Sequence, residues 1–113
     1  MSKITLKNIL AKKKRGAKIT VLTAYDYPFA SIFDRAGVDI ILVGDSLSNV
    51  VLGLSSTREV NMDEMIHHAR AVRRGVQRAF LIGDMPFDAY QKNPSLAVKN
   101  AKRFMKEAGC DAV

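Results

Sequence analysis

The amino-acid sequence predicts an α/β fold in which buried parallel strands alternate with helices. Three segments have the composition of buried strands, because they are rich in apolar and β-branched residues: residues 18–26, 38–45 and 79–84. Segments with the apolar spacing of amphipathic helices lie between and after them. Strands that alternate with helices in this way form a parallel sheet with right-handed crossover connections.

The helices are recognisable from their ends and their apolar faces. A short basic helix is expected at about residues 6–14, before the first strand. Pro28 is at a favoured first helical position and Gly37 ends that helix, whereas Asn61 and Glu64 form a capping pair for the next one. The residues expected to face the core are Phe29, Ile32, Phe33 and Ala36; Met65, Ala69, Val72 and Val76; and, in a helix that starts at Asn93 and Pro94, Ala97, Ala101, Phe104, Met105 and Ala108.

A weak internal repeat supports the same architecture. The segments RAGVDII and EAGCDAV each place a helix end, a glycine, an aspartate and the start of a strand in that order. Their glycines, Gly37 and Gly109, are two βα units apart. The last four residues, CDAV, are therefore expected to begin a fourth strand.

Two parallel α/β architectures fit this order, a doubly wound sheet and a (β/α)8 TIM barrel. No strand is followed by the G-x-G-x-x-G turn of a dinucleotide-binding sheet, so the barrel is favoured. A barrel needs about 250 residues, whereas the chain has 113, enough for about the first three βα units and the start of strand 4. We therefore expect residues 1–113 to be the N-terminal half of a single (β/α)8 barrel domain.

Composition and charge narrow the possible partners. Hydrophobic residues make up 48% and charged residues 26% of the chain, which is typical of globular proteins. No apolar run approaches the roughly 20 residues of a membrane helix, and no secretory signal peptide is evident. The single cysteine excludes an internal disulfide and fits a reducing compartment. We therefore expect a cytoplasmic location and no membrane partner.

The net charge of +7 comes from the N-terminal arm. Seven basic residues precede the first acidic residue, Asp26, and the remaining basic and acidic residues balance. An arm that binds a polyanion is one interpretation. A solvated basic helix is preferred, because no aromatic or glycine pattern accompanies the charges, and no nucleic-acid partner is expected.

Asp26, Asp45 and Asp84 each stand at the carboxyl end of a predicted strand. In parallel α/β folds the carboxyl ends of the strands carry the binding and catalytic groups, and neighbouring strands lie about 5 Å apart. Two carboxylates held this close repel each other unless a cation lies between them. Mg²⁺ commonly takes one or two carboxylates, so Asp45 and Asp84 are candidate metal ligands. The glycines before them, Gly44 and Gly83, would let a ligand approach the backbone.

Structural roles are the alternatives for these and other polar residues. An aspartate after a strand often caps the next helix, and Asp26 fits that role because Pro28 follows it closely. His67 and His68 are adjacent on a helix, face different directions and make a poor metal pair. Cys110 begins a strand at the opposite end and is expected in the core.

Four blocks of the sequence, TAYDYPFA, DIILVGDSLSNVVLG, TREVNMDEMIHHARAVRRG and LIGDMPF, closely resemble the ketopantoate hydroxymethyltransferases. The resemblance extends over nearly the whole chain from Lys3 onward. The VGDS block is also loosely similar to the phosphoenolpyruvate mutase and isocitrate lyase group of barrels, which is the alternative enzyme class. A non-catalytic structural or binding fragment is a third interpretation.

The resemblance implies a barrel that assembles as a homo-oligomer, commonly a decamer. It implies transfer of a hydroxymethyl group from 5,10-methylenetetrahydrofolate to 3-methyl-2-oxobutanoate, which gives 2-dehydropantoate for pantothenate and coenzyme A biosynthesis. By match to the family motifs, Asp45 and Asp84 bind Mg²⁺, and Asp45, Ser46 and Asp84 bind the keto acid. Loss of a proton alpha to the ketone gives an enolate, and the metal stabilises its charge as a Lewis acid.

The resemblance also implies that part of the site lies outside these residues. In the family, a lysine and a glutamate come after strand 4 and a further glutamate is the general base; none of these is within residues 1–113. We therefore expect no catalytic base in this chain and no activity from it alone. Backbone N–H groups around Ser46 would hold the substrate carboxylate, and residues 48–60 form a candidate lid that contains Gly53. The early basic helix would cover the bottom of the barrel.

Overall fold

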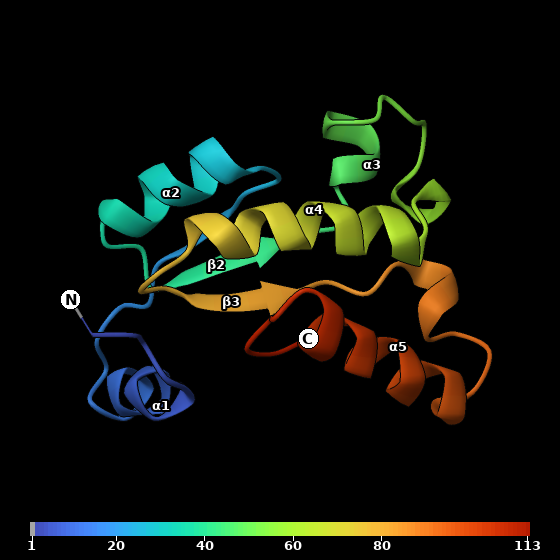
Figure 1. The fold of residues 1–113 in the computed structure, drawn as a ribbon. Coiled ribbons are helices and arrows are strands. Elements are labelled where there is room, and N and C mark those ends of the chain that lie inside the picture. The colour runs from blue at the N-terminus through green and yellow to red at the C-terminus, as the bar shows by residue number, and fades with distance from the viewer. Residues whose placement is uncertain (1) are drawn as a thin grey trace.

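The computed structural model describes residues 2–113, in which three strands form one parallel sheet (Figure 1). The strands β1 (Val21–Thr23), β2 (Ile40–Val43) and β3 (Phe80–Gly83) are adjacent in chain order. Val21 pairs with Ile40, which in turn pairs with Phe80, so the strands are aligned at their amino ends. Ala112 forms a parallel bridge with Ile82 on the other edge of β3, which confirms that CDAV begins to pair as a further strand.

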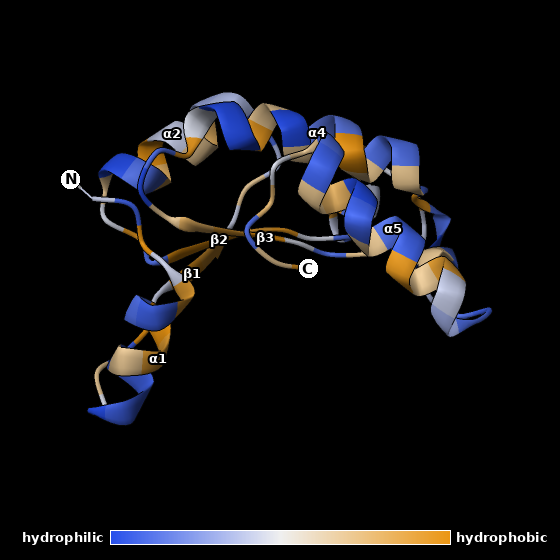
Figure 2. Ribbon diagram, turned by 60° about the horizontal axis from the view of Figure 1, so that its bottom comes forward, coloured by the Kyte–Doolittle hydropathy of each residue, from blue (hydrophilic) through white to orange (hydrophobic). Residues whose placement is uncertain are grey.

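Three long helices cover one face of the sheet (Figure 2). They are α2 (Tyr27–Arg35), α4 (Met62–Gly75) and α5 (Pro94–Glu107), and α4 lies between the other two. The helix α1 (Leu6–Lys14), at the residues predicted for it, lies near the amino ends of the strands, away from that layer (Figures 1 and 2). Within residues 2–113, no helix is long and apolar enough to cross a membrane.

Shorter elements surround the carboxyl ends of the strands. They are α3 (Leu47–Val50), the 3₁₀ turn η1 (Thr57–Glu59) and the 3₁₀ turn η2 (Phe87–Ala89). The sequence predicted a loop where α3 and η1 lie, because four- and three-residue helices leave no periodic apolar pattern. A hydrogen bond nevertheless connects the two ends of this segment, since Ser48 Oγ donates to the Ser56 carbonyl at 2.6 Å.

The predicted start and core face of α4 are confirmed. The Asn61 side chain accepts from the Glu64 N–H at 2.9 Å, and the Glu64 carboxylate accepts from the Asn61 N–H at 3.0 Å, which is a capping box. All four predicted inward residues of this helix are buried beneath it against the sheet: Met65, Ala69, Val72 and Val76. The apolar spacing of this segment therefore predicted correctly which of its residues form the core between helices and sheet.

The opposite face of the sheet has a smaller apolar cluster near the amino ends of the strands. Ile4, Ile40 and Phe80 are buried there, and Ile9 of α1 packs against them. The N-terminal segment therefore covers the amino end of this face, with the Ile4 N–H donating to the Arg78 carbonyl at 2.7 Å.

The predicted core face of α2 is wrong in part. Phe29 and Ile32 are 56% and 50% exposed and Ala36 is exposed as well, whereas Ala30 and Asp34 are buried. The reason is close packing of α2 against α4 at Gly75, where an added Cβ would lie only 2.7 Å from the Tyr27 carbonyl oxygen. Only the small-residue side of α2 fits that contact, so Phe29 and Ile32 turn outward, whereas Phe33 packs, partly buried, against the main core.

Two other burial predictions also differ from the structure. β1 is an edge strand within residues 2–113 and is exposed rather than buried, with Val21 51% exposed. Met105 of α5 faces outward, whereas Phe104 and Ala108 are buried as predicted. Asn100 occupies an inward position on α5, where its side-chain amide donates to the Ala89 carbonyl at 2.8 Å.

Candidate active site at the carboxyl ends of the strands

Asp45 and Asp84 meet at the carboxyl ends of β2 and β3. The Asp45 backbone N–H donates to the Asp84 Oδ2 atom at 2.9 Å. The Asp84 N–H donates to the Val43 carbonyl at 3.0 Å, which extends the pairing of the two strands up to the acids. The two strands end side by side in Figure 1. The predicted juxtaposition of these two aspartates is therefore confirmed.

The charge of this carboxylate pair is not compensated by a basic side chain from residues 2–113. None of the ion pairs within this range involves Asp45 or Asp84. Partial burial and the adjacent Asp84 carboxylate both raise the pKa of Asp45, because each disfavours its ionised form. Perturbed carboxylate pKa values cluster at functional sites, so the pair is a candidate site.

The donor set fits a hard cation, but only in part. Two aspartate carboxylates are oxygen ligands of the type that Mg²⁺ prefers, and Mg²⁺ often takes only one or two protein carboxylates. Within residues 2–113 no group of three or more His, Cys, Asp or Glu side chains could hold a metal ion. The pair is thus suited to supply two ligands of a larger set.

Ser46 follows Asp45 and begins α3. Its hydroxyl does not cap the helix, and instead lies 2.8 Å from the hydroxyl oxygen of Tyr25. Tyr25 lies two residues after the end of β1, and its ring packs, partly buried, against the main core. Three consecutive strand ends therefore contribute to one polar group, which comprises Tyr25, Asp45, Ser46 and Asp84.

Sequence reasoning missed Tyr25, although it lies inside the block TAYDYPFA. The signal available was its position at the carboxyl end of the first predicted strand, one residue before Asp26. His68 of α4 holds the backbone at this point, since its Nδ1 lies 2.8 Å from the Tyr25 carbonyl oxygen. A carbonyl oxygen only accepts, so Nδ1 carries the proton in this contact.

Three other candidate features, Asp26, the His67 and His68 pair, and Cys110, have the structural positions that the sequence offered as alternatives. Asp26 caps α2 by accepting from the Phe29 N–H at 3.0 Å, so it is not part of the carboxylate pair. His67 is exposed and His68 contacts the Tyr25 carbonyl. Cys110 is buried, and that burial raises the pKa of its thiol to about 11, so it stays protonated in the core.

The two glycines before the acids differ from each other. A Cβ at Gly83 would collide with the ring of Phe104 from α5, so this glycine makes room for the core and not for a ligand. That part of the sequence prediction is wrong, because residue 83 faces the helix layer. A Cβ at Gly44 would lie 3.3 Å from Ser46 Oγ, so a side chain there would crowd the hydroxyl group of the candidate site.

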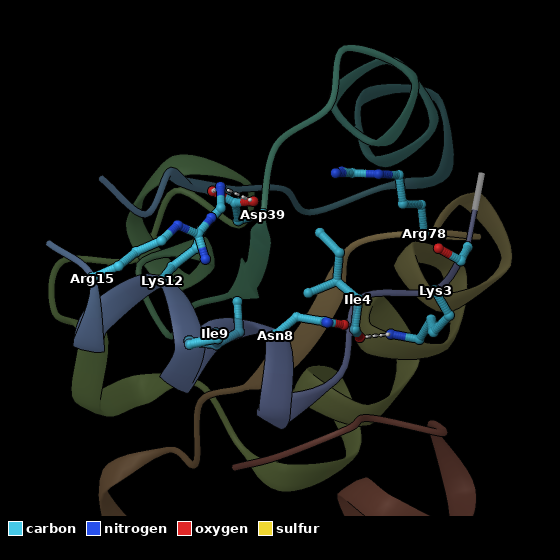
Figure 3. A pocket seen from close by; sticks show the side chains of 10 residues that line it. Lys3, Ile4, Asn8, Ile9, Lys12, Arg15, Asp39 and Arg78 are labelled. Carbon is cyan, nitrogen blue, oxygen red and sulfur yellow. Dashed lines mark hydrogen bonds and ion pairs between the residues drawn. The ribbon is translucent and has the colours of Figure 1, made fainter. Parts of the chain in front are cut away.

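The amino end of the sheet has a cavity of about 510 Å³ beside α1 (Figure 3). Four basic residues and one acid line it: Lys3, Lys12, Arg15, Arg78 and Asp39. Lys12 Nζ lies 2.8 Å from Asp39 Oδ1, so the buried acid at this end has a cation beside it. This hollow is at the opposite end of the sheet from the carboxylate pair.

Comparison with known proteins gives one family. The family model of ketopantoate hydroxymethyltransferase matches residues 3–113. A 3-methyl-2-oxobutanoate hydroxymethyltransferase of Acetivibrio thermocellus is 56% identical over 98% of the chain, which is 39% of that protein. Proteins of the same name from Chlorobaculum parvum and Ignicoccus hospitalis are 57% and 51% identical over 97% and 100% of the chain. The chain belongs to the ketopantoate hydroxymethyltransferase family.

This membership decides between the two enzyme classes left open by the sequence. The family match runs through every block that suggested it and favours the transferases over the phosphoenolpyruvate mutase and isocitrate lyase group. The chain spans about two-fifths of the length of the curated ketopantoate hydroxymethyltransferases it matches.

Proposed function

We propose that this chain supplies the first part of the active site of a 3-methyl-2-oxobutanoate hydroxymethyltransferase. The reaction would transfer a hydroxymethyl group from 5,10-methylenetetrahydrofolate to 3-methyl-2-oxobutanoate and give 2-dehydropantoate. The observation that carries the proposal is the meeting of Asp45 and Asp84 beside Ser46, at the carboxyl ends of parallel strands, in a chain whose relatives bear that name.

The fold we propose for the complete domain is a (β/α)8 barrel, in which residues 1–113 form the N-terminal half. Two features support it. The strands follow one another in chain order with no reversal, and the pairing of Ala112 with β3 continues that order. The three long helices also share one face of the sheet, as the outer helices of a barrel do (Figure 2).

Asp45 and Asp84 would hold a Mg²⁺ ion, which supplies Lewis-acid polarisation of the keto oxygen when it is bound. The Ser46 hydroxyl would donate to the substrate carboxylate. The Leu47 and Ser48 N–H groups at the start of α3 already donate to the Gly44 and Asp45 carbonyls, so they are not free for this role. The base that takes the proton next to the ketone would come from outside residues 1–113. A homo-oligomer in the cytoplasm, with no nucleic-acid or membrane partner, completes the proposal.

A hybrid enzyme tests the proposed reaction. Residues 1–113 would replace the matching segment of the Acetivibrio thermocellus relative, and formation of 2-dehydropantoate from the keto acid and 5,10-methylenetetrahydrofolate would be measured. We expect the hybrid to be active and the 113-residue chain alone to be inactive. A folded hybrid that binds both substrates yet forms no product would contradict the proposed function.

Calorimetric titration of the same hybrid tests the metal site separately. We expect Asp84→Asn to weaken Mg²⁺ binding at least tenfold, because it removes one of two charged ligands. Asp26→Asn is the matched control, since it also removes a strand-end charge while asparagine still caps the helix. Equal Mg²⁺ affinities for the two variants would remove Asp84 from the metal site.

A further inference from the structure

Tyr25 links two strand ends through a single hydrogen bond. Its hydroxyl oxygen lies 2.8 Å from Ser46 Oγ, and either group is able to donate in this pair. The Tyr25 ring is held by packing against the main core, and its carbonyl accepts from His68 of α4 at 2.8 Å. The tyrosine is thus fixed on both its side chain and its backbone, whereas Ser46 depends on it for a partner.

Within residues 2–113, the Ser46 hydroxyl forms no hydrogen bond other than the one with Tyr25. It begins α3 without a side-chain cap bond, although serine commonly caps in that position. The hydroxyl lies close to Gly44, where an added Cβ would approach it to 3.3 Å. Its rotation about the Cβ–Oγ bond is therefore set mainly by Tyr25.

We propose that Tyr25 is a positioning residue, which donates to Ser46 Oγ and so directs the Ser46 proton toward the substrate carboxylate. The inference rests on the proposed function, in which Ser46 contacts the keto acid. A phenol is the stronger donor of the two hydroxyl types, and a carboxylate accepts but does not donate. The chain Tyr25 to Ser46 to carboxylate therefore orders both protons in one direction, and each bond strengthens the next.

The first test uses the active hybrid enzyme and the variant Tyr25→Phe, which keeps the packed ring. We expect its KM for 3-methyl-2-oxobutanoate to rise about three- to tenfold, the effect of one hydrogen bond, with a smaller change in kcat. The KM for 5,10-methylenetetrahydrofolate should not change. Tyr27→Phe, at an exposed tyrosine two residues away, is the control and should behave like the unaltered hybrid.

A double-mutant cycle separates positioning from a general loss of stability. Ser46→Ala should raise the same KM, and adding Tyr25→Phe to it should raise it no further, because the tyrosine acts only through the serine. If the KM of the double variant rose by the product of the two single-variant increases, the proposal would be overturned. A Tyr25→Phe hybrid that unfolds at a lower temperature but keeps its KM for the keto acid would overturn it too.

A binding measurement on the hybrid enzyme, which needs no turnover, separates this inference from the proposed reaction. With ¹³C label at the tyrosine Cζ carbons, Tyr27 and Tyr90 are exposed internal references. Addition of 3-methyl-2-oxobutanoate with Mg²⁺ should move the Tyr25 resonance, and Ser46→Ala should abolish that movement. An equal movement in Ser46→Ala would show that Tyr25 acts without the serine and would overturn the inference, whether or not the hybrid is active.

Discussion

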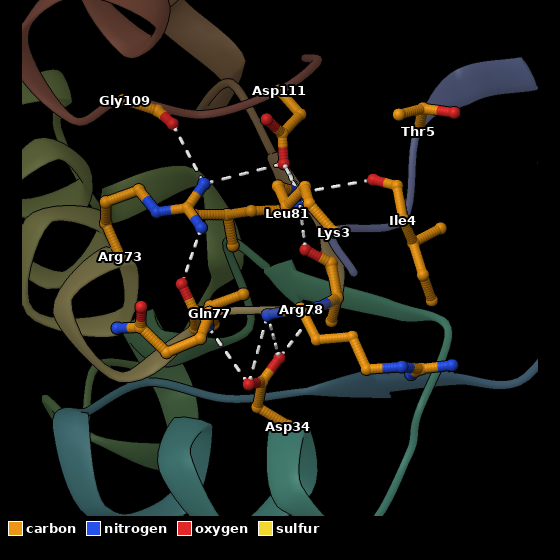
Figure 4. Close-up of polar contacts among 12 residues, drawn as sticks. Lys3, Ile4, Thr5, Asp34, Arg73, Gln77, Arg78, Leu81, Gly109 and Asp111 are labelled. Carbon is orange, nitrogen blue, oxygen red and sulfur yellow. Dashed lines mark hydrogen bonds and ion pairs between the residues drawn. The ribbon is translucent and has the colours of Figure 1, made fainter. Parts of the chain in front are cut away.

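The acidic side chains at the two ends of the sheet differ in their hydrogen-bond and ion-pair partners. At the amino end, Asp34, Asp39 and Asp111 each accept several hydrogen bonds, and two of them also pair with lysine (Figures 3 and 4). At the carboxyl end, Asp45 and Asp84 lie against each other with no basic partner from residues 2–113. The acids at the amino end thus have hydrogen-bond donors or lysine partners, whereas the two acids at the carboxyl end have no basic partner from residues 2–113.

The pKa shifts follow the same division. Burial alone would raise the pKa of Asp39 and Asp111, but hydrogen bonds from Lys12 and Thr20 to Asp39, and from Lys3 and the Leu81 N–H to Asp111, lower both. Burial and the neighbouring carboxylate raise the pKa of Asp45. The amino end therefore gains stability from its ionised acids, whereas the carboxyl end loses some. This difference separates an end whose acids stabilise the fold from the end that we propose binds the ligand.

The largest effect is expected at Asp34, which joins α2 to the start of β3. Its carboxylate accepts from the N–H groups of Gln77, Arg78 and Ala79 at 2.7 to 3.2 Å (Figure 4). Asp34→Ala would leave these donors without partners, so we expect it to lower the free energy of unfolding by about 3 kcal/mol or more. Urea denaturation of the chain measures this loss.

The matched control for Asp34 is Asp63→Ala. Asp63 is highly exposed and pairs only with Arg103 on the surface, so its removal should cost about 0.5 kcal/mol or less. Similar losses for the two variants would contradict the view that the amino end of the sheet is a stabilising network.

A smaller effect is expected at Lys12, the partner of Asp39. Lys12→Met should lower the free energy of unfolding at pH 7 by about 1 to 2 kcal/mol, since the Asp39 carboxylate loses a charged donor. A lowered pKa contributes stability above the unfolded pKa, near 4, and loses it as the pH falls through the folded pKa. The difference between Lys12→Met and the unaltered chain should therefore be full near pH 7 and shrink in acid.

The control here is Lys13→Met, which removes an exposed charge from the same helix turn. It should leave both the stability and its pH dependence unchanged. If Lys13→Met reproduced the effect of Lys12→Met, the general positive charge of the arm would be responsible and not the ion pair with Asp39.

The parts of the fold that follow from local pattern could be predicted from the sequence. The capping box and apolar stripe of α4 are local, and so is the placement of Asp45 and Asp84 directly after apolar strands. The repeated Gly and Asp of RAGVDII and EAGCDAV were also predicted, and Gly37 and Gly109 both have positive φ. Residues within a few positions of each other decide these features, so the sequence contains enough information for them.

The remaining features depend on contacts between distant segments. The basic arm was interpreted as a solvated helix, yet Lys3 and Lys12 pair with Asp111 and Asp39, the two aspartates of the repeat. The outward turn of α2 depends on its packing at Gly75 of α4. Nothing near Lys12 or Phe29 in the sequence indicates either contact, because both arise only when the sheet brings separate βα units together.

The same limit applies within the candidate site. The two acids were found from their position, but the hydrogen bond between Tyr25 and Ser46 joins residues of different strand ends. Its geometry depends on how far β1 and β2 are offset and on where α3 begins. The sequence shows that polar residues follow the strands, and the structure shows which of them meet.

The smallest expected effect has the opposite sign and tests the comparison most directly. Asp45→Asn removes one of two facing charges, so in buffer with EDTA at pH 7 it should raise the free energy of unfolding by about 0.5 to 1 kcal/mol. A raised pKa gives stability that is fully present below the unfolded pKa, near 4, and lost as the pH rises through the folded value. The gain in Asp45→Asn should therefore vanish in acid, where the unaltered aspartate is already protonated.

Asp26→Asn is the control for this variant, because Asp26 also follows a strand but already has a role as a helix cap. Its stability should be unchanged at either pH, since asparagine caps about as well as aspartate. A stabilised Asp45→Asn that has also lost keto-acid binding would show that this end gives up stability to keep a ligand site. A loss of stability at pH 7 as large as that of Lys12→Met would instead place Asp45 among the structural acids, and the contrast between the two ends would fail.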